Sequence, residues 1–168
     1  MSRAYHFRLE HRGRTLQGLP FGADHIAEVM DLEKSCFPDP WTETLFAQEA
    51  KPEDHRWNLV LFEGDELAAY VISWVVSGET HLLNFAVRPD IQGQGVGRLF
   101  FRWLIHEARR AGDNVFLLEV RASNERAKHL YESEGLHVVM TRDSYYPDSG
   151  EDALVMMCFL QKDPEEKS

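Results

Sequence analysis

The sequence contains few cysteines and no long apolar run. Cys36 and Cys158 are the only cysteines in 168 residues, too few for a disulfide framework or a cysteine-based metal site. No segment approaches the roughly 20 consecutive apolar residues of a membrane-spanning helix, and the first residues lack the apolar segment of a secretory signal. The eight histidines show no paired metal-ligand spacing. We therefore expect a cytoplasmic protein with reduced thiols, no metal and no membrane partner.

An excess of basic residues is also lacking. The formal net charge is −10, whereas nucleic-acid-binding domains usually carry a strongly basic face, so no direct nucleic-acid partner is expected. The acidic surface could attract a basic peptide or could simply keep the protein in solution. The length is that of one ordinary domain, and we expect a single domain over residues 1–168, with residues 163–168 as a frayed tail.

The most informative feature that is present is the glycine-rich segment QGQGVG at residues 92–97. Alternating glycines let backbone N–H groups approach a ligand closely, and a helix that begins there adds the positive end of its dipole. A Walker loop would need lysine and a hydroxyl after the glycines, where this chain has Val96, Gly97 and Arg98. A dinucleotide fingerprint would need glycine at Arg98 and an acidic residue at the end of the next strand, whereas Glu119 lies within its strand. The segment predicts a site for anionic oxygens, with NAD-dependent oxidoreduction as a remote alternative and a turn without ligand as another.

The hydrophobic pattern predicts strands and helices in a mixed arrangement. Helical spacing begins at Ile26 and is stopped by Pro38, and Asn124 is suited to cap a later helix that Gly135 ends. We expect helices at 42–50 and 95–112 and strands at 57–62, 67–76, 80–87, 115–120, 136–145 and 152–161. A strand, a crossover helix and a strand within about forty residues imply a parallel pair inside the sheet. Residues 1–20 could add a strand, bind a partner or be disordered.

Several segments resemble a known family. The glycine segment after NFAVRP (84–89) resembles the acetyl-CoA pyrophosphate loop of the GNAT N-acetyltransferases. The segments that resemble the RimI branch of that family are CFPDPWT (36–42), LEVRASN (118–124), LYESEGL (130–136), YYP (145–147) and GEDA (150–153). The resemblance covers about residues 26–160. It implies an α/β (α+β) GNAT fold, namely a mixed, mostly antiparallel twisted sheet of about seven strands with a central parallel pair, flanked by about four helices.

The resemblance also implies an activity and the residues that carry it. It implies direct transfer of acetyl from the co-substrate acetyl-CoA, and for the RimI branch the acceptor is the N-terminal alanine of a small-subunit ribosomal protein, whose N-terminal peptide would be the partner. Glu119 would be the base and Tyr131 the acid. The implied cofactor-binding residues are Phe85, Ala86, Val87, Gly93, Gln94, Gly95, Val96, Gly97, Arg98 and Asn124. Gly93 departs from the family pattern, because a larger and often basic residue is common there.

The residues alone leave several of these roles open. Glu119 is a carboxylate in an apolar strand and could be a base, or it could pair with an arginine. Tyr131 stands at helical spacing with neighbouring apolar residues and could be a core residue. Trp41, Tyr145 and Tyr146 could form the aromatic walls of a peptide groove or pack ordinarily. Cys36 has no base beside it in the sequence, so direct transfer is preferred over an acetylated thiol.

Two other functions remain open at this point. The chain could be a GNAT enzyme that acetylates a small amine or an internal lysine. It could also be a non-catalytic regulatory module that binds acyl-CoA.

Overall fold

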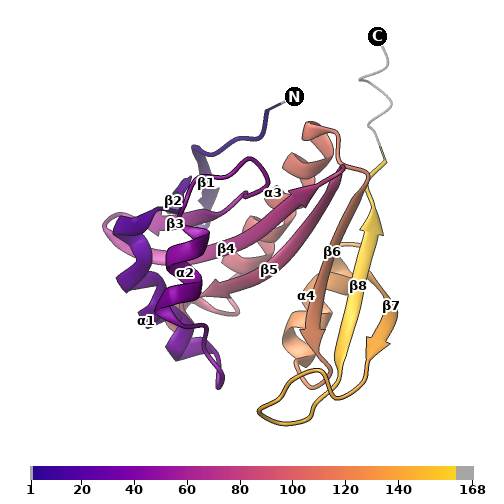
Figure 1. Cartoon of the computed structure of the whole chain (residues 1–168). Helices are drawn as coiled ribbons and strands as arrows, with labels where there is room; N and C mark the ends of the chain where they lie inside the picture. Colours follow the sequence, from indigo (N-terminus) through magenta and orange to yellow (C-terminus); the bar gives the residue numbers. More distant parts are fainter. Residues whose placement is uncertain (1, 162–168) are drawn as a thin grey trace.

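The computed structural model describes residues 2–161, and in this range an eight-stranded sheet carries helices on both faces (Figure 1). The strands are β1 (Phe7–His11), β2 (Arg14–Pro20), β3 (Leu59–Glu63), β4 (Glu66–Val76), β5 (Glu79–Val87), β6 (Val115–Arg121), β7 (His137–Arg142) and β8 (Ala153–Phe159). The helices are α1 (Ile26–Cys36), α2 (Glu43–Glu49), α3 (Val96–Ala111) and α4 (Glu125–Ser133), with short 3-10 turns η1 (Ala23–His25) and η2 (Pro89–Ile91). The strand order is β1-β2-β3-β4-β5-β6-β8-β7.

Residues 7–20 lie in the segment whose structure the sequence left open, and they form an extra hairpin. Strands β1 and β2 pair antiparallel, and β2 continues the sheet by pairing with β3. The turn consists of Arg12 and Gly13, which both have positive φ (49° and 78°), the backbone form that two-residue hairpin turns favour. Leu9 and Leu16 lie opposite each other and are buried. The hairpin brings the sheet to eight strands instead of about seven.

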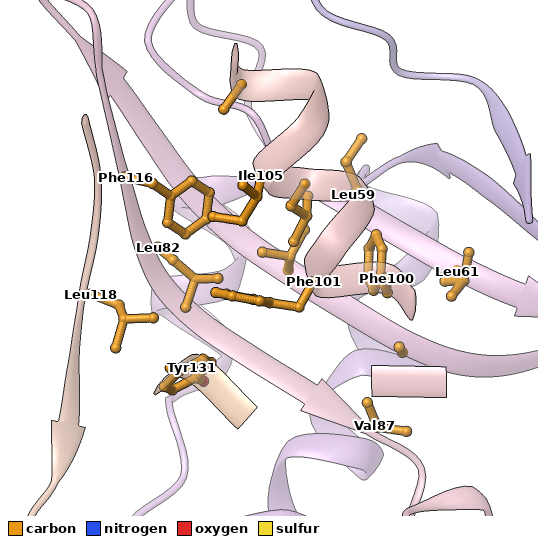
Figure 2. Close-up of a cluster of buried hydrophobic side chains, with 14 of the residues drawn as sticks. Leu59, Leu61, Leu82, Val87, Phe100, Phe101, Ile105, Phe116, Leu118 and Tyr131 are labelled. Atoms are coloured by element: carbon orange, nitrogen blue, oxygen red, sulfur yellow. The ribbon is translucent and has the colours of Figure 1, made fainter. Parts of the chain in front are cut away.

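The two faces of the sheet bury separate apolar clusters. Phe100 and Phe101 of α3 pack with Leu82 of β5, Leu118 of β6 and Tyr131 of α4 in the larger cluster (Figure 2). On the other face α1 and α2 contribute residues such as Val29 and Phe46, which pack on Tyr70 and Ile72 of β4. Helices α3 and α4 therefore cover one face, and α1 with α2 covers the opposite face.

The parallel pair formed by β5 and β6 opens along its length. Residues 79–82 of β5 pair with residues 115–118 of β6, and the pairing stops at Leu82 and Leu118. On its other side β5 remains paired with β4 as far as Val87. Leu83 is an extra residue in this pairing, because Leu82 lies opposite Ser73 and Asn84 lies opposite Ile72. Such a bulge bends the strand that carries it, so the second half of β5 turns away from β6. Figure 1 shows the result, with β4 and β5 diverging from β6 and β8.

The fold predicted from the sequence is confirmed in its main features. The sheet is mixed. Within the described residues β5 and β6 are parallel, and every other pair of neighbouring strands in the sheet is antiparallel. Four α-helices flank it in this part of the chain. The expected frayed tail, residues 163–168, lies outside the described residues. No helix between residues 2 and 161 is long and apolar enough to cross a membrane.

Candidate active site

The glycine-rich loop lies where β5 has left β6 and where α3 begins. Gly93 and Gly95 have φ of +78° and +91°, a left-handed region that glycine adopts without a steric penalty. The first helical bond that starts in the loop runs from Leu99 N to Gly95 O at 3.0 Å, so the N–H groups of Val96, Gly97 and Arg98 have no intrahelical acceptor. These donors and the dipole of a 16-residue helix point in the direction that favours an anion, so the predicted anion site is a geometry that this loop permits.

The N-terminal hairpin supports this loop from outside. His11 Nε2 lies 2.8 Å from the carbonyl oxygen of Gln94, and Arg14 donates to the Gln94 side-chain oxygen at 2.8 Å. Arg14 also holds both carboxylate oxygens of Glu63 at 2.9 and 2.7 Å. A Cβ on Gly95 would lie 2.7 Å from His11 Nε2. The hairpin therefore fits against a loop that has no side chain at this position.

The end of β5 has a backbone edge that faces no strand, although one of its carbonyl groups is already hydrogen-bonded. Because pairing with β6 ends at Leu82, the backbone of Phe85, Ala86 and Val87 does not face a partner strand on that side. The Val87 carbonyl nevertheless accepts a hydrogen bond from Gln92 Nε2 at 2.8 Å and is contacted by Cys36 Sγ at 3.5 Å. A ligand that used this oxygen would share it with Gln92. Burial raises the pKa of the Cys36 thiol, which agrees with a transfer that does not pass through Cys36.

Glu119 projects from β6 toward three polar neighbours. Its carboxylate forms an ion pair with Arg142 of β7, with Oε1 3.1 Å from Arg142 Nε, and its side chain is 19% exposed. It raises the pKa of the Tyr145 hydroxyl, chiefly through a hydrogen bond. Half-buried His81 of β5 lies within its electrostatic range, although burial is the main influence on that imidazole and lowers its pKa. The pairing of Glu119 with an arginine, one of the two possibilities left open by the sequence, is therefore observed. This ion pair is compatible with a role as base if a substrate ammonium replaces the Arg142 guanidinium.

Tyr131 reaches the opening from α4 and is 6% exposed. Its ring packs against Phe101, with centroids 4.9 Å apart, and Figure 2 shows it beside Leu118 at the border of the cluster. Burial, with a smaller contribution from Tyr146, raises the pKa of its hydroxyl well above the ordinary value. Among residues 2–161 the hydroxyl has no hydrogen-bond partner, so it is a protonated donor available to a ligand.

The two candidate proton-transfer groups approach from opposite faces of β6. Leu118 belongs to the cluster beneath α3 and α4, together with Tyr131. Side chains alternate along a strand, so Glu119 points to the other face, on the side of α1 and α2. A ligand in the opening between β5 and β6 could therefore meet an acid on one face and a base on the other.

Asn124 and Arg98 have structural contacts of their own. Asn124 Oδ1 accepts from Ala127 N at 3.1 Å and caps α4, as expected from its position. Arg98 is half-exposed and lies 3.9 Å from Glu134, which Arg102 holds more closely at 2.9 Å. Arg98 is thus only loosely paired, near the N–H groups that begin α3.

The three aromatic candidates come from two different loops. Trp41 follows α1, packs on Phe46 and donates its backbone N–H to the buried carboxylate of Glu33 at 2.9 Å. Tyr145 and Tyr146 lie between β7 and β8 with their rings edge to face at 5.2 Å. Tyr146 also stacks beneath the Arg121 guanidinium at 3.9 Å, and burial raises its pKa to about 12. The tyrosine pair therefore lies close to Glu119, whereas Trp41 is anchored to the α1 and α2 face.

Sequence reasoning missed Arg142, His11 and Arg126 as neighbours of the site. The position of Arg142 depends on strand register, because Glu119 is opposite Val155 on β8 and Val155 is opposite Met140 on β7. The register of β7 shifts between Val138 and Met140, and no local pattern marks that shift. The remaining neighbours come from segments far away in the chain. No group of three or more metal-ligating side chains is found among the described residues.

A mixed sheet with an opened parallel pair, and a glycine-rich helix start at that opening, are features of an acetyltransferase fold. The sequence profile of the acetyltransferase (GNAT) family matches residues 26–136. The chain belongs to this family, whose members use acetyl-CoA.

Relatives with a described activity match this chain over most of its length. The chain is 40% identical over 127 residues to the [ribosomal protein bS18]-alanine N-acetyltransferase of Escherichia coli K12, covering 74% of this chain and 84% of that one. It is 34% identical over 133 residues to a putative enzyme of the same description from Bacillus subtilis, covering 79% and 88%. The crystal structure of the ribosomal-protein-S18-alanine N-acetyltransferase from Escherichia coli superimposes with a TM-score of 0.81 at 33% identity, covering 91% of this chain and 99% of that one.

Proposed function

We propose that this protein transfers the acetyl group of acetyl-CoA to the N-terminal alanine of ribosomal protein bS18. The observation that carries the proposal is the joint presence of an open β5 and β6 pair, a helix-capping glycine loop and the Glu119 and Tyr131 pair. The relatives named above act on this acceptor according to their descriptions, and they match this chain over most of its length.

The chemistry assigns one task to each part of the opening. The N–H groups at the start of α3 would hold the diphosphate of the cofactor, and the backbone of residues 85–87 would bind the pantetheine arm and polarise the thioester carbonyl. The amine nitrogen attacks the thioester carbon, so that a C–N bond forms and the C–S bond breaks. Glu119 takes one proton from the ammonium before the attack, and the second proton leaves the nitrogen for solvent as the tetrahedral intermediate collapses. The Tyr131 hydroxyl gives a proton to the departing thiolate and is reprotonated from solvent. Asn124 would contact the cofactor while it caps α4.

An α-amine suits this base better than a lysine does. A free α-amino group has a pKa of about 8 and a lysine about 10.4, so deprotonation of lysine at neutral pH costs roughly 3 kcal/mol more. Trp41 on one side and Tyr145 with Tyr146 on the other would line the acceptor peptide. Arg142 occupies the position next to Glu119 where the substrate ammonium would be bound.

Two matched peptides test the proposal. One carries the N-terminal sequence of bS18 with a free alanine, and the other has the same sequence with a blocked N-terminus and an internal lysine. Coenzyme A release with acetyl-CoA is expected from the first peptide alone. Release only from the blocked peptide would replace the proposal by lysine acetylation, and no release from either would favour a small-amine substrate or a binder without turnover.

A further inference from the structure

Arg126 bridges the opening between β5 and β6. We call the strands on the β5 side of this opening the β5 arm, and the strands on the β6 side, with α4, the β6 arm. It lies in the first turn of α4, which belongs to the β6 arm, and Arg126 Nη1 donates to the side-chain oxygen of Gln92 in the β5 arm at 3.1 Å. Its Nη2 lies 2.8 Å from the point that a Cβ on Gly93 would occupy. The guanidinium therefore occupies space over the glycine loop that exists because residue 93 has no side chain.

Within residues 2–161 no ion pair neutralises the charge of Arg126. Arg88 pairs with Glu66 and Asp90, and Arg102 pairs with Glu134. In the described part of the chain no carboxylate lies within 4.0 Å of Arg126, and the neutral amide of Gln92 is its hydrogen-bond acceptor. A guanidinium presents several donors in one plane, a geometry that suits phosphate oxygens. Its position beside the free N–H groups of the α3 start adds a full positive charge to a site that otherwise relies on backbone dipoles.

We propose that Arg126 binds the diphosphate of acetyl-CoA from the α4 side, and that glycine at position 93 makes room for it. This inference rests on the proposed function, because it assumes that acetyl-CoA occupies the opening. The side chain of Gln92 connects this contact to the thioester end, since its Oε1 accepts from Arg126 while its Nε2 donates to the Val87 carbonyl at 2.8 Å. Diphosphate binding at Arg126 therefore also orients Gln92, and with it the backbone at the end of β5.

Calorimetric titration of the full-length protein with coenzyme A and with 3′-dephospho-coenzyme A tests the proposal. The variants are Arg126→Gln, which removes the charge, and Arg126→Lys, which keeps it but loses the planar fork. Arg8→Gln is the matched control, because Arg8 is exposed and pairs with Glu10 on the same strand, away from the loop. Thermal melting of each variant confirms that the fold is retained, as expected for a substitution at an exposed position.

The expected result is a dissociation constant for both ligands that rises about tenfold or more in Arg126→Gln, the effect of losing one hydrogen bond between charged groups. Arg126→Lys should fall between Arg126→Gln and the unaltered protein, and Arg8→Gln should bind as tightly as the unaltered protein. Unchanged affinity in Arg126→Gln would overturn the inference. A loss seen with coenzyme A but absent with the 3′-dephospho form would also overturn it, because the contact would then be to the ribose phosphate. If the unaltered protein bound neither ligand, the proposed function itself would fail.

Discussion

The carboxylate of Glu119 is ion-paired with Arg142, with 3.1 Å between Oε1 and Nε. The pair joins the middle of β6 to the end of β7 and lies on the face of the sheet opposite Tyr131. Arg142 is 47% exposed, and an ion pair of this kind contributes less than about 1 kcal/mol to folding. A substrate ammonium can therefore displace the guanidinium at small cost.

Substitutions at Glu119 and at Arg142 distinguish a catalytic base from a residue that only forms an ion pair. Glu119→Gln should lower kcat about 100-fold or more, because the variant cannot accept the ammonium proton. Arg142→Gln should keep kcat within about threefold, since it removes the ion pair and leaves the carboxylate in place. Steady-state rates with the alanine peptide measure both. Equal losses in the two variants would mean that Glu119 acts only as a partner of Arg142.

Tyr131→Phe should lower kcat without weakening cofactor binding. The hydroxyl would no longer protonate the thiolate, and the expected loss is about 100-fold. Because the hydroxyl has no hydrogen-bond partner among the described residues, the melting temperature should stay nearly unchanged. Full activity in this variant would exclude the acid role, and the binding of coenzyme A provides the control for an intact site.

Buried tyrosines should make the protein lose stability in alkali. Burial raises the pKa of Tyr131 and of Tyr70 above the ordinary value of 10.0, so the folded state holds these protons more tightly than the unfolded chain. The corresponding stability is complete below about pH 10 and is lost as the pH rises from there toward the folded-state pKa values. Urea unfolding at a series of pH values measures the decline, which should be shallower in Tyr131→Phe. An equal decline in the variant would contradict the assignment.

Gly95→Ala should weaken coenzyme A binding about tenfold, because the loop must shift. The alanine would need a φ of +91° and its Cβ would lie 2.7 Å from His11 Nε2, at a cost of about 1–2 kcal/mol from the backbone alone. Gly112→Ala is the matched control, since Gly112 has a φ of +95° at the other end of α3 with nothing within 4 Å of the new Cβ. The control should lose similar stability and keep its affinity. Equal affinities in the two variants would show that the loop geometry does not matter.

Glu33→Ala should destabilise the protein by about 3 kcal/mol, because it leaves buried donors without an acceptor. The Glu33 carboxylate is 1% exposed and accepts from the Tyr70 hydroxyl, from Asn84 Nδ2 at 2.9 Å and from Trp41 N at 2.9 Å. Loss of the Trp41 contact should also raise KM for the peptide. Glu28→Ala, on the exposed side of the same helix, should change neither quantity. An unchanged KM in Glu33→Ala would separate the Trp41 loop from acceptor binding.

Features encoded in short segments were predictable from the sequence. Pro38 follows the end of α1 and Gly112 caps α3 with a left-handed backbone, and both are local stop signals. The place of the glycine loop between a strand and a helix was predictable because the three segments are contiguous in the sequence. The parallel pair followed from the length of the crossover between its strands.

Features that depend on register or on distant segments were not predictable. The bulge at Leu83, which ends the β5 and β6 pairing, leaves no signal in an apolar strand. The contact between Arg142 and Glu119 depends on a register shift in β7. The N-terminal hairpin had a visible signal, the Arg12 and Gly13 turn between alternating apolar residues, but its docking on Gln94 is a tertiary contact.

The most direct test of the proposed function is acetylation of intact ribosomal protein bS18 with a free N-terminal alanine. The purified enzyme and acetyl-CoA are incubated with the protein, and mass spectrometry with fragmentation locates the added acetyl groups. One acetyl group on the alanine nitrogen, absent with Glu119→Gln, is the predicted result. Acetyl groups on lysine side chains, or an unmodified protein, would contradict the proposal.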